Sequence, residues 1–281
     1  MLELKFNLIN NFKTKEYLDM LKFTFEALEK IYYKLFADVD EIPVQVVIAD
    51  DMNSAHLEIR PDLKDYFMLD APDNGFNGRM VAPIDIDDAF IILMNYHRIL
   101  QYTEDGSLTW MGTFAHELTH IHDYTEMSIK EKMSSYLPLE KIQDYIMFQM
   151  WTEYHARKKG YLFLRYIFWQ EGKLPGEDEQ KVYIREKEWP YHINEHYKEF
   201  HMNDDGNNQM YITMQLLGRY SAWCDLFPDS FNVRSFAKDY KANPWIIHLF
   251  SFLREHESLE SIYPCFNDLK CIFRENWDGI F

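Results

Sequence analysis

The chain has 281 residues, of which 47% are hydrophobic and 27% are charged. This balance is typical of a globular protein and excludes a disordered chain. The formal net charge of −17 argues against a nucleic-acid partner, because an acidic surface repels a phosphate backbone. The same charge favours basic ligands, although it names none.

We expect a cytoplasmic protein with no membrane partner, and the sequence leaves its oligomeric state open. No apolar run approaches the roughly 18 residues of a membrane-spanning helix, and the first residues lack a signal-peptide pattern. The chain has three cysteines, Cys224, Cys265 and Cys271. Their odd number and spacing indicate reduced thiols rather than disulfides or a zinc knuckle.

The N-terminal part predicts one helix followed by several short strands. Apolar residues recur at helical spacing from Lys15 to Phe36. A loop rich in Asp, Pro, Asn and Gly is expected from Asp70 to Gly78. Strands are expected over Val44–Ala49, His56–Arg60, Arg79–Ile84 and Ala89–Met94. The last of them, apolar on both faces, has the pattern of a buried strand.

The rest of the chain reads as mainly helical. One helix is predicted from Thr109 to about Met127, with Thr109 or Ser107 as its N-cap. A second helix begins at Pro138 and continues to about Trp169. The linker-like stretch Gly172–Glu179 follows, and then an aromatic-rich helical part. The fold class is therefore α+β, with an expected catalytic domain over 1–171 and a helical C-terminal subdomain over 180–281 packed against it.

The strongest chemical signal is the sequence His-Glu-x-x-His at His116, Glu117 and His120. On a helix, residues i and i+4 lie on one face about 6 Å apart along the axis, so both imidazoles can bind one zinc ion. Glu117 borders this site and is placed to take a proton from zinc-bound water. The alternative is that two surface histidines match the pattern by chance.

A catalytic zinc requires a third protein ligand and one open position. Glu153 is the candidate, because it lies in the middle of an apolar stripe, where a carboxylate needs a partner. The alternative partner is Arg157, one turn away, in an i,i+4 ion pair.

Other residues near the motif have weaker signals. Asp123 is a candidate for a hydrogen bond to a ligating imidazole, for the third ligand itself, or for a solvated charge. His122 points away from His116 and is expected on the surface or in packing. Tyr154 and His155, beside Glu153, are candidates to stabilise the oxyanion of a tetrahedral intermediate.

The sequence also contains the inverted motif His-x-x-Glu-His at His192, Glu195 and His196. Charged residues surround it, and it follows a Trp-Pro pair. It is therefore the weaker candidate for a metal site, and one of its histidines could line a groove.

His116-Glu117-Leu-Thr-His120 with Glu153 downstream resembles the zincin metallopeptidases of the gluzincin type. The chain is most similar to their small bacterial members and to the ImmA/IrrE-like peptidases. The resemblance covers about Lys15 to Ile167 and implies a small mixed sheet packed on the HExxH helix and on a glutamate-bearing helix. It implies one Zn²⁺ per chain, held by His116, His120 and Glu153, with Glu117 as general base.

In this family the edge strand of the sheet pairs with the substrate backbone, and Ala89–Met94 is expected to be that strand. The residues after Glu153 depart from the thermolysin-like ligand motif. We expect a zinc-dependent protease, a hydrolase that cleaves a peptide or protein substrate. The alternative is a catalytically silent metal-binding protein with a regulatory or partner-binding role.

Overall fold

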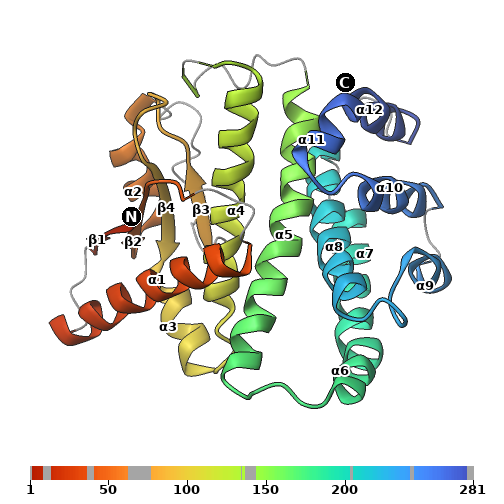
Figure 1. Ribbon diagram of the computed structural model, residues 1–281, viewed down its shortest axis with the longest axis horizontal. Coiled ribbons are helices and arrows are strands. Elements are labelled where there is room, and N and C mark those ends of the chain that lie inside the picture. The colour runs from red at the N-terminus through yellow and green to blue at the C-terminus, as the bar shows by residue number, and fades with distance from the viewer. Residues whose placement is uncertain are drawn as a thin grey trace. The chain divides into compact units, whose positions relative to one another are not determined.

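The computed structural model describes residues 2–8, 14–36, 41–62, 77–133, 135–136, 144–202, 205–240 and 244–276. The chain divides into two compact units, Met1–Leu137 (unit 1) and Pro138–Phe281 (unit 2) (Figure 1). The predicted α+β class is confirmed, since strands and helices alternate in unit 1 and helices follow in unit 2.

Unit 1 contains a four-stranded sheet and its helices. The strands are β1 (Leu2–Asn7), β2 (Val44–Ala49), β3 (Gly78–Val81) and β4 (Phe90–Asn95). The helices are α1 (Lys15–Leu35), α2 (Met52–Ile59), α3 (Tyr96–Glu104) and α4 (Thr109–Lys130). The predicted helix over Lys15–Phe36, the strands over Val44–Ala49 and Ala89–Met94, and the helix from Thr109 are confirmed. The predicted loop at Asp70–Gly78 lies mostly outside the described residues.

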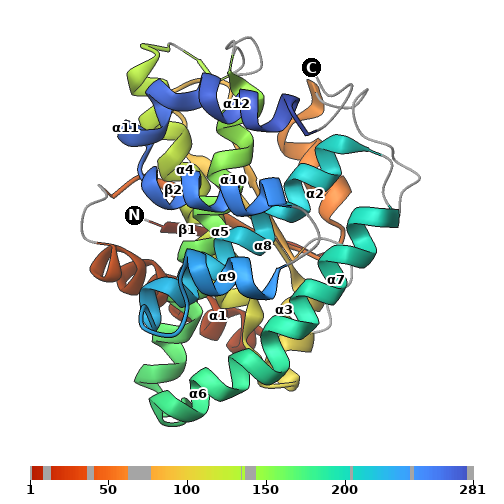
Figure 2. The ribbon, with the colours of Figure 1, turned by 90° about the vertical axis from the view of Figure 1, so that its right-hand side faces the viewer.

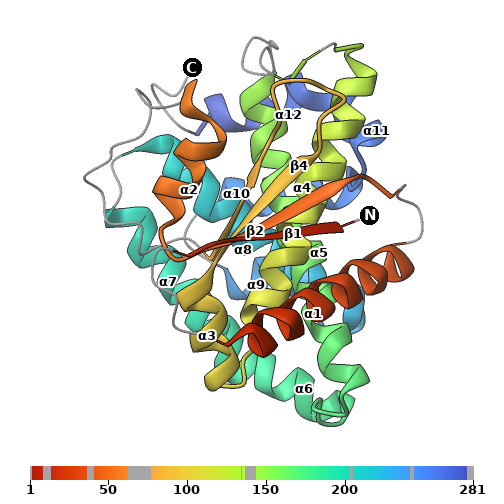
Figure 3. The ribbon, with the colours of Figure 1, turned by 90° about the vertical axis from the view of Figure 1, so that its left-hand side faces the viewer.

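The sheet is mixed, and its strand order is β1-β2-β4-β3. β1, β2 and β4 run parallel and lie side by side (Figure 3), whereas β3 is antiparallel to β4. The prediction that Ala89–Met94 is the edge strand is therefore wrong, because β4 pairs on both sides. β3 is the edge strand next to it. The predicted strand Arg79–Ile84 is shorter than expected and ends at Val81.

The predicted strand His56–Arg60 is also wrong, because this segment belongs to helix α2. Asp51 caps the helix: its side chain accepts a hydrogen bond from the backbone N–H of Ser54 over 3.0 Å. α2 packs its apolar side on one face of the sheet, in a cluster with Val47 and Leu93. The apparent alternation of the segment comes from a short helix with one buried side.

α4 is buried along most of its length and packs against β3, β4 and the helices α1 and α3. Phe114 of α4 lies against Phe25 of α1, with ring centroids 5.1 Å apart. The N-cap is Leu108 in a left-handed conformation and no side chain caps the helix, so the predicted cap at Thr109 or Ser107 is wrong.

Unit 2 is helical. Its elements are α5 (Tyr145–Gln170), α6 (Glu177–Tyr183), η3 (Ile184–Glu188), α7 (Trp189–Met202), α8 (Gly206–Leu226), α9 (Val233–Asp239), α10 (Pro244–Glu255), α11 (Leu259–Ile262), η4 (Tyr263–Cys265) and α12 (Phe266–Arg274). The predicted helix ending near Trp169 and the helical character of the C-terminal part are confirmed. The predicted start of the α5 helix at Pro138 lies outside the described residues.

α5 and α8 lie side by side and form the centre of unit 2 (Figure 1). Gly218 permits this, because a Cβ atom there would collide with the backbone carbonyl of Tyr154. The ribbon continues without a break from α6 into α7 (Figure 2), and the π-helical turn η3 joins them just before Pro190. The wider turn tolerates the absence of a backbone N–H donor at proline.

Along the chain, the boundary between the two compact units falls between residues 137 and 138, whereas the predicted domains are 1–171 and 180–281. The two divisions differ in where they place α5, and the functional division stays a prediction. Cys224, Cys265 and Cys271 are free thiols, as expected. Within the residues that the structure describes, none of the helices combines the length and apolar character needed to cross a membrane.

Candidate metal centre

His116 and His120 point their imidazoles at one another from successive turns of α4. Their Nε2 atoms lie 3.0 Å apart, and both side chains are buried. Two nitrogens bound to one tetrahedral zinc at about 2.05 Å each would be about 3.3 Å apart. The donor set and its spacing therefore fit a zinc ion with little movement of either ring.

Glu117 is buried beside this pair, and its carboxylate accepts a hydrogen bond from the backbone N–H of Met80 over 2.8 Å. Met80 belongs to β3, the edge strand. β3 can approach α4 because of Gly78: an added Cβ would lie 2.8 Å from the Cγ2 of Thr113. The absence of a side chain at Gly78 thus allows the strand to hold the carboxylate of Glu117.

The other side of α4 is anchored in packing. Thr119 donates its hydroxyl proton to the carbonyl of Ala115 over 2.9 Å, so the hydroxyl of Tyr32, 2.9 Å away, donates to Thr119. The ring of His122 stacks on Tyr32 with centroids 5.8 Å apart, which confirms a packing role. Asp123 is only 2% exposed, and this excludes a solvated charge.

Glu153 lies on α5 in unit 2, where its carboxylate accepts a hydrogen bond from the side-chain amide of Gln215 on α8. The alternative partner from the sequence, Arg157, forms no ion pair with Glu153 within the described residues. The hydrogen bond from Gln215 is therefore a tertiary contact, supplied by α8.

His116, His120 and Glu153 form a group that could hold a metal ion. Among the described residues, this group has the composition that the sequence predicts for the zinc ligands.

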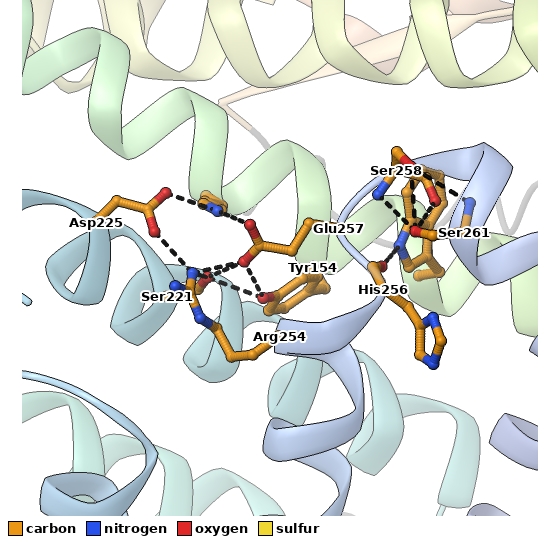
Figure 4. A network of polar contacts seen from close by, with 10 residues as sticks. Tyr154, Ser221, Asp225, Arg254, His256, Glu257, Ser258 and Ser261 are labelled. Carbon is orange, nitrogen blue, oxygen red and sulfur yellow. Dashed lines mark hydrogen bonds and ion pairs between the residues drawn. The ribbon is translucent and has the colours of Figure 1, made fainter.

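Tyr154 is fully buried in a polar network of unit 2 (Figure 4). Its hydroxyl donates to Ser221 over 2.8 Å, and the carboxylate of Glu257 lies 3.4 Å away. Burial raises the pKa of this hydroxyl strongly, so it stays protonated and able to donate. These contacts account for Tyr154, and its predicted role as oxyanion donor stays a prediction.

The same network joins two cations and two carboxylates. Lys158 forms ion pairs with Asp225 at 2.7 Å and with Glu257 at 2.8 Å. Arg254 pairs with the same two acids (Figure 4). His155, next to Tyr154, stacks on Trp151 with centroids 5.0 Å apart, and its predicted catalytic role also stays a prediction.

The inverted motif does not bring its histidines together. His196 is buried between Thr213 and Tyr240, with ring nitrogens 3.1 and 3.4 Å from their hydroxyl oxygens. His192 instead contacts the guanidinium of Arg219. The two rings therefore have different partners, which disfavours the weaker of the two metal-site hypotheses.

The contributions of two residues to the candidate centre cannot be predicted from the sequence. Met80 acts through its backbone N–H, which carries no sequence signal. Gln215 is an amide far along the chain from Glu153, and only the packing of α8 on α5 brings the two together.

Comparisons with known proteins add no family. No family model matches the chain. Neither a curated protein nor a solved structure matches it. The functional proposal therefore rests on the residues described above.

Proposed function

We propose that this protein is a zinc-dependent metallopeptidase of the zincin type, with Glu117 as its general base. The observation that carries the proposal is the convergence of the His116 and His120 Nε2 atoms, 3.0 Å apart, with the buried carboxylate of Glu117 beside them. A zinc ion in this position would acidify water and polarise a peptide carbonyl.

Glu117 takes the proton of the attacking water and passes it to the leaving amine. The Met80 N–H orients its carboxylate through a bond of 2.8 Å. A carboxylate fixed by a backbone donor loses little freedom when it begins to act, because its position is already set.

Glu153 is the proposed third ligand, and the composition of the group, two imidazoles and one carboxylate, supports it. The hydrogen bond from Gln215 would orient this carboxylate, as outer partners of metal ligands commonly do. A ligand set of two imidazoles and one carboxylate leaves the fourth zinc position for water.

β3 replaces Ala89–Met94 as the proposed site of substrate binding. It is the edge strand, and its Met80 N–H points away from β4 and toward α4. A peptide that adds to this edge as a further strand would run past the general base. The backbone of β3 thus links the position of the substrate to that of Glu117.

The decisive experiment measures the zinc content of the purified protein and of its variants, together with cleavage of a peptide library. The parent should hold about one zinc per chain, and His116→Gln and Glu153→Gln should lose it. The matched controls are His97→Gln on α3 and Glu171→Gln after α5, which change exposed residues and should keep the metal.

Glu117→Gln should retain zinc and lose cleavage, because the amide cannot accept the proton. A parent that binds zinc but cleaves no peptide would favour the catalytically silent metal-binding protein. A parent that takes up no zinc after reconstitution would refute the proposal. Retention of zinc in Glu153→Gln would move the third ligand elsewhere, with Asp123 tested next.

A further inference from the structure

Unit 2 contains a cavity of about 340 Å³ between α5, α7 and α8. We name it the arginine pocket after two of its lining residues, Arg157 of α5 and Arg219 of α8. His192, Glu195 and Gln215 also line it. The residues of the inverted His-x-x-Glu-His motif thus line this pocket, and the proposed metal centre does not use them.

The two arginines are not neutralised by ion pairs in the described part of the chain, although the charge of Glu188 acts on Arg219. Within the described residues neither guanidinium forms an ion pair, and the Nε atom of Arg157 is buried without a hydrogen-bond partner. Lys158, the next residue on α5, forms ion pairs with two carboxylates. Lys158 is therefore neutralised by carboxylates of unit 2, whereas its neighbour Arg157 lines the pocket without an ion pair within the described residues.

His192 holds Arg219 in place and adds no negative charge. The Nη1 atom of Arg219 contacts its ring, and because a guanidinium can only donate, the ring must accept and is neutral. Burial first, and then Arg219 and Arg157, lower the pKa of His192 to about 3. The same effects, burial first and then Arg157, lower the pKa of Arg219 to about 10.

The pocket is a local exception in an acidic protein. The chain has a formal net charge of −17, yet two guanidiniums line one cavity and, within the described residues, neither is in an ion pair. Glu195 and Glu199 also line the cavity, but neither pairs with an arginine. Two like charges in a partly desolvated pocket raise the free energy of the folded protein, and an anion that binds in the pocket lowers it.

A carboxylate suits this pocket best, because the planar fork of arginine matches its two oxygens. The pocket also adjoins the proposed metal ligand within unit 2. Gln215 lines the pocket and donates to Glu153, and Arg157 lies one turn of α5, about 6 Å along the axis, from Glu153. This distance is the length of about two extended residues.

We propose that the arginine pocket binds a carboxylate of the peptide substrate, supplied by its C-terminus or by an acidic side chain. The inference rests on the proposed peptidase function and deepens it. Cleavage is then directed to a bond within about two residues of the bound carboxylate. The negative net charge of the chain favours basic ligands, whereas the two arginines of this pocket favour an acidic one.

The test is isothermal titration of the full chain, after metal removal, with three acetylated peptides of one sequence. One has a free C-terminal carboxylate, one is its C-terminal amide, and one is an amide with a glutamate in the last position. The carboxylate peptide should bind about tenfold or more tightly than the plain amide. The third peptide distinguishes the two sources of the carboxylate.

Arg157→Gln should abolish the preference for the carboxylate. Arg157→Lys, which keeps the charge without the fork, should retain part of it. Arg274→Gln on α12 makes the same charge change at an exposed residue and should leave the preference intact. Thermal unfolding of each variant establishes that it is folded, and the lysine variant provides the test if the glutamine variant is not.

Equal binding of the carboxylate and amide peptides would overturn the inference, and so would an equal loss of preference in Arg274→Gln. Because titration uses the metal-free chain, the result is independent of zinc and of turnover. Peptide cleavage without any dependence on Arg157 would refute the pocket and leave the peptidase standing. Arginine-dependent binding in a chain that never takes up zinc would support the pocket and refute the peptidase.

Discussion

The backbone N–H of Met80 donates a hydrogen bond to the carboxylate of Glu117 over 2.8 Å. We expect Met80→Pro, which removes this donor, to lower kcat about tenfold, because the carboxylate loses its orientation. An edge strand tolerates proline when the lost N–H points away from the sheet. Zinc content should not change.

Met80→Ala is the matched control, since it removes the side chain and keeps the N–H. Cleavage of a standard peptide by both variants, with their zinc content, checks the prediction. Equal rates for the two variants would mean that the Met80 donor does not assist Glu117.

Gly78 sets the approach of β3 to α4, because an added Cβ would lie 2.8 Å from the Cγ2 of Thr113. Gly78→Ala should lower the free energy of unfolding by about 1–3 kcal/mol through overpacking. Thr113→Ser deletes Cγ2 and keeps the hydroxyl, so the same glycine substitution should cost less in that background. Urea unfolding of the four proteins in a double-mutant cycle measures the coupling; additive costs would contradict the steric explanation.

Tyr154 is assigned here to the network with Ser221 and Glu257. Tyr154→Phe should lower the free energy of unfolding by about 1–2 kcal/mol, because a buried hydrogen bond is lost. The kcat of the folded variant should stay within about twofold of the parent. A loss of about a hundredfold in kcat at unchanged stability would instead support the oxyanion role. Tyr183→Phe, at an exposed tyrosine of α6, is the control.

His196 makes the protein sensitive to acid. Burial lowers its pKa from 6.5 to about 4, so the unfolded chain binds a proton at a pH at which the folded chain does not. Its contribution is therefore fully present above about pH 6.5 and is lost as the pH falls toward 4. Between pH 7 and pH 5 the loss is about 2 kcal/mol.

His196→Asn should lower stability at neutral pH and flatten its pH dependence by that amount. His97→Asn, at an exposed histidine of α3, should leave the pH dependence unchanged. Urea unfolding at the two pH values measures both. An unchanged slope in His196→Asn would place the acid sensitivity on other groups.

Sequence reasoning locates the elements whose pattern is long and regular. α1, β2, β4 and α4 follow from apolar periodicity, and the HExxH motif places both histidines on one face of α4. It fails at α2, where the five alternating residues His56–Arg60 resemble a strand although Asp51 caps a helix. It also fails at the sheet edge, since strand order depends on pairings that no single strand encodes.

The same division holds for the candidate site. His116, Glu117 and His120 follow from spacing alone, because one helix turn brings them together. The contact between Glu153 and Gln215, and the pocket that joins Arg157 to Arg219, need α8 to pack on α5. An i,i+4 ion pair is the local expectation for Glu153 and Arg157, and tertiary packing replaces it.

The π-helical turn η3 affects which single-residue deletions would preserve the arginine pocket. A π turn is a helix that accommodates one extra residue, and each residue of an α-helix adds about 100° of rotation. Deletion of one residue between Ile184 and Glu188 would therefore restore a regular helix and keep the face of α7, whereas deletion of one residue within the regular helix α6 would turn that face by about 100°. His192 would then leave the arginine pocket while every pocket residue stayed unaltered. The position of His192 in the pocket thus depends on the number of residues in α6 and η3, which contribute none of the lining residues.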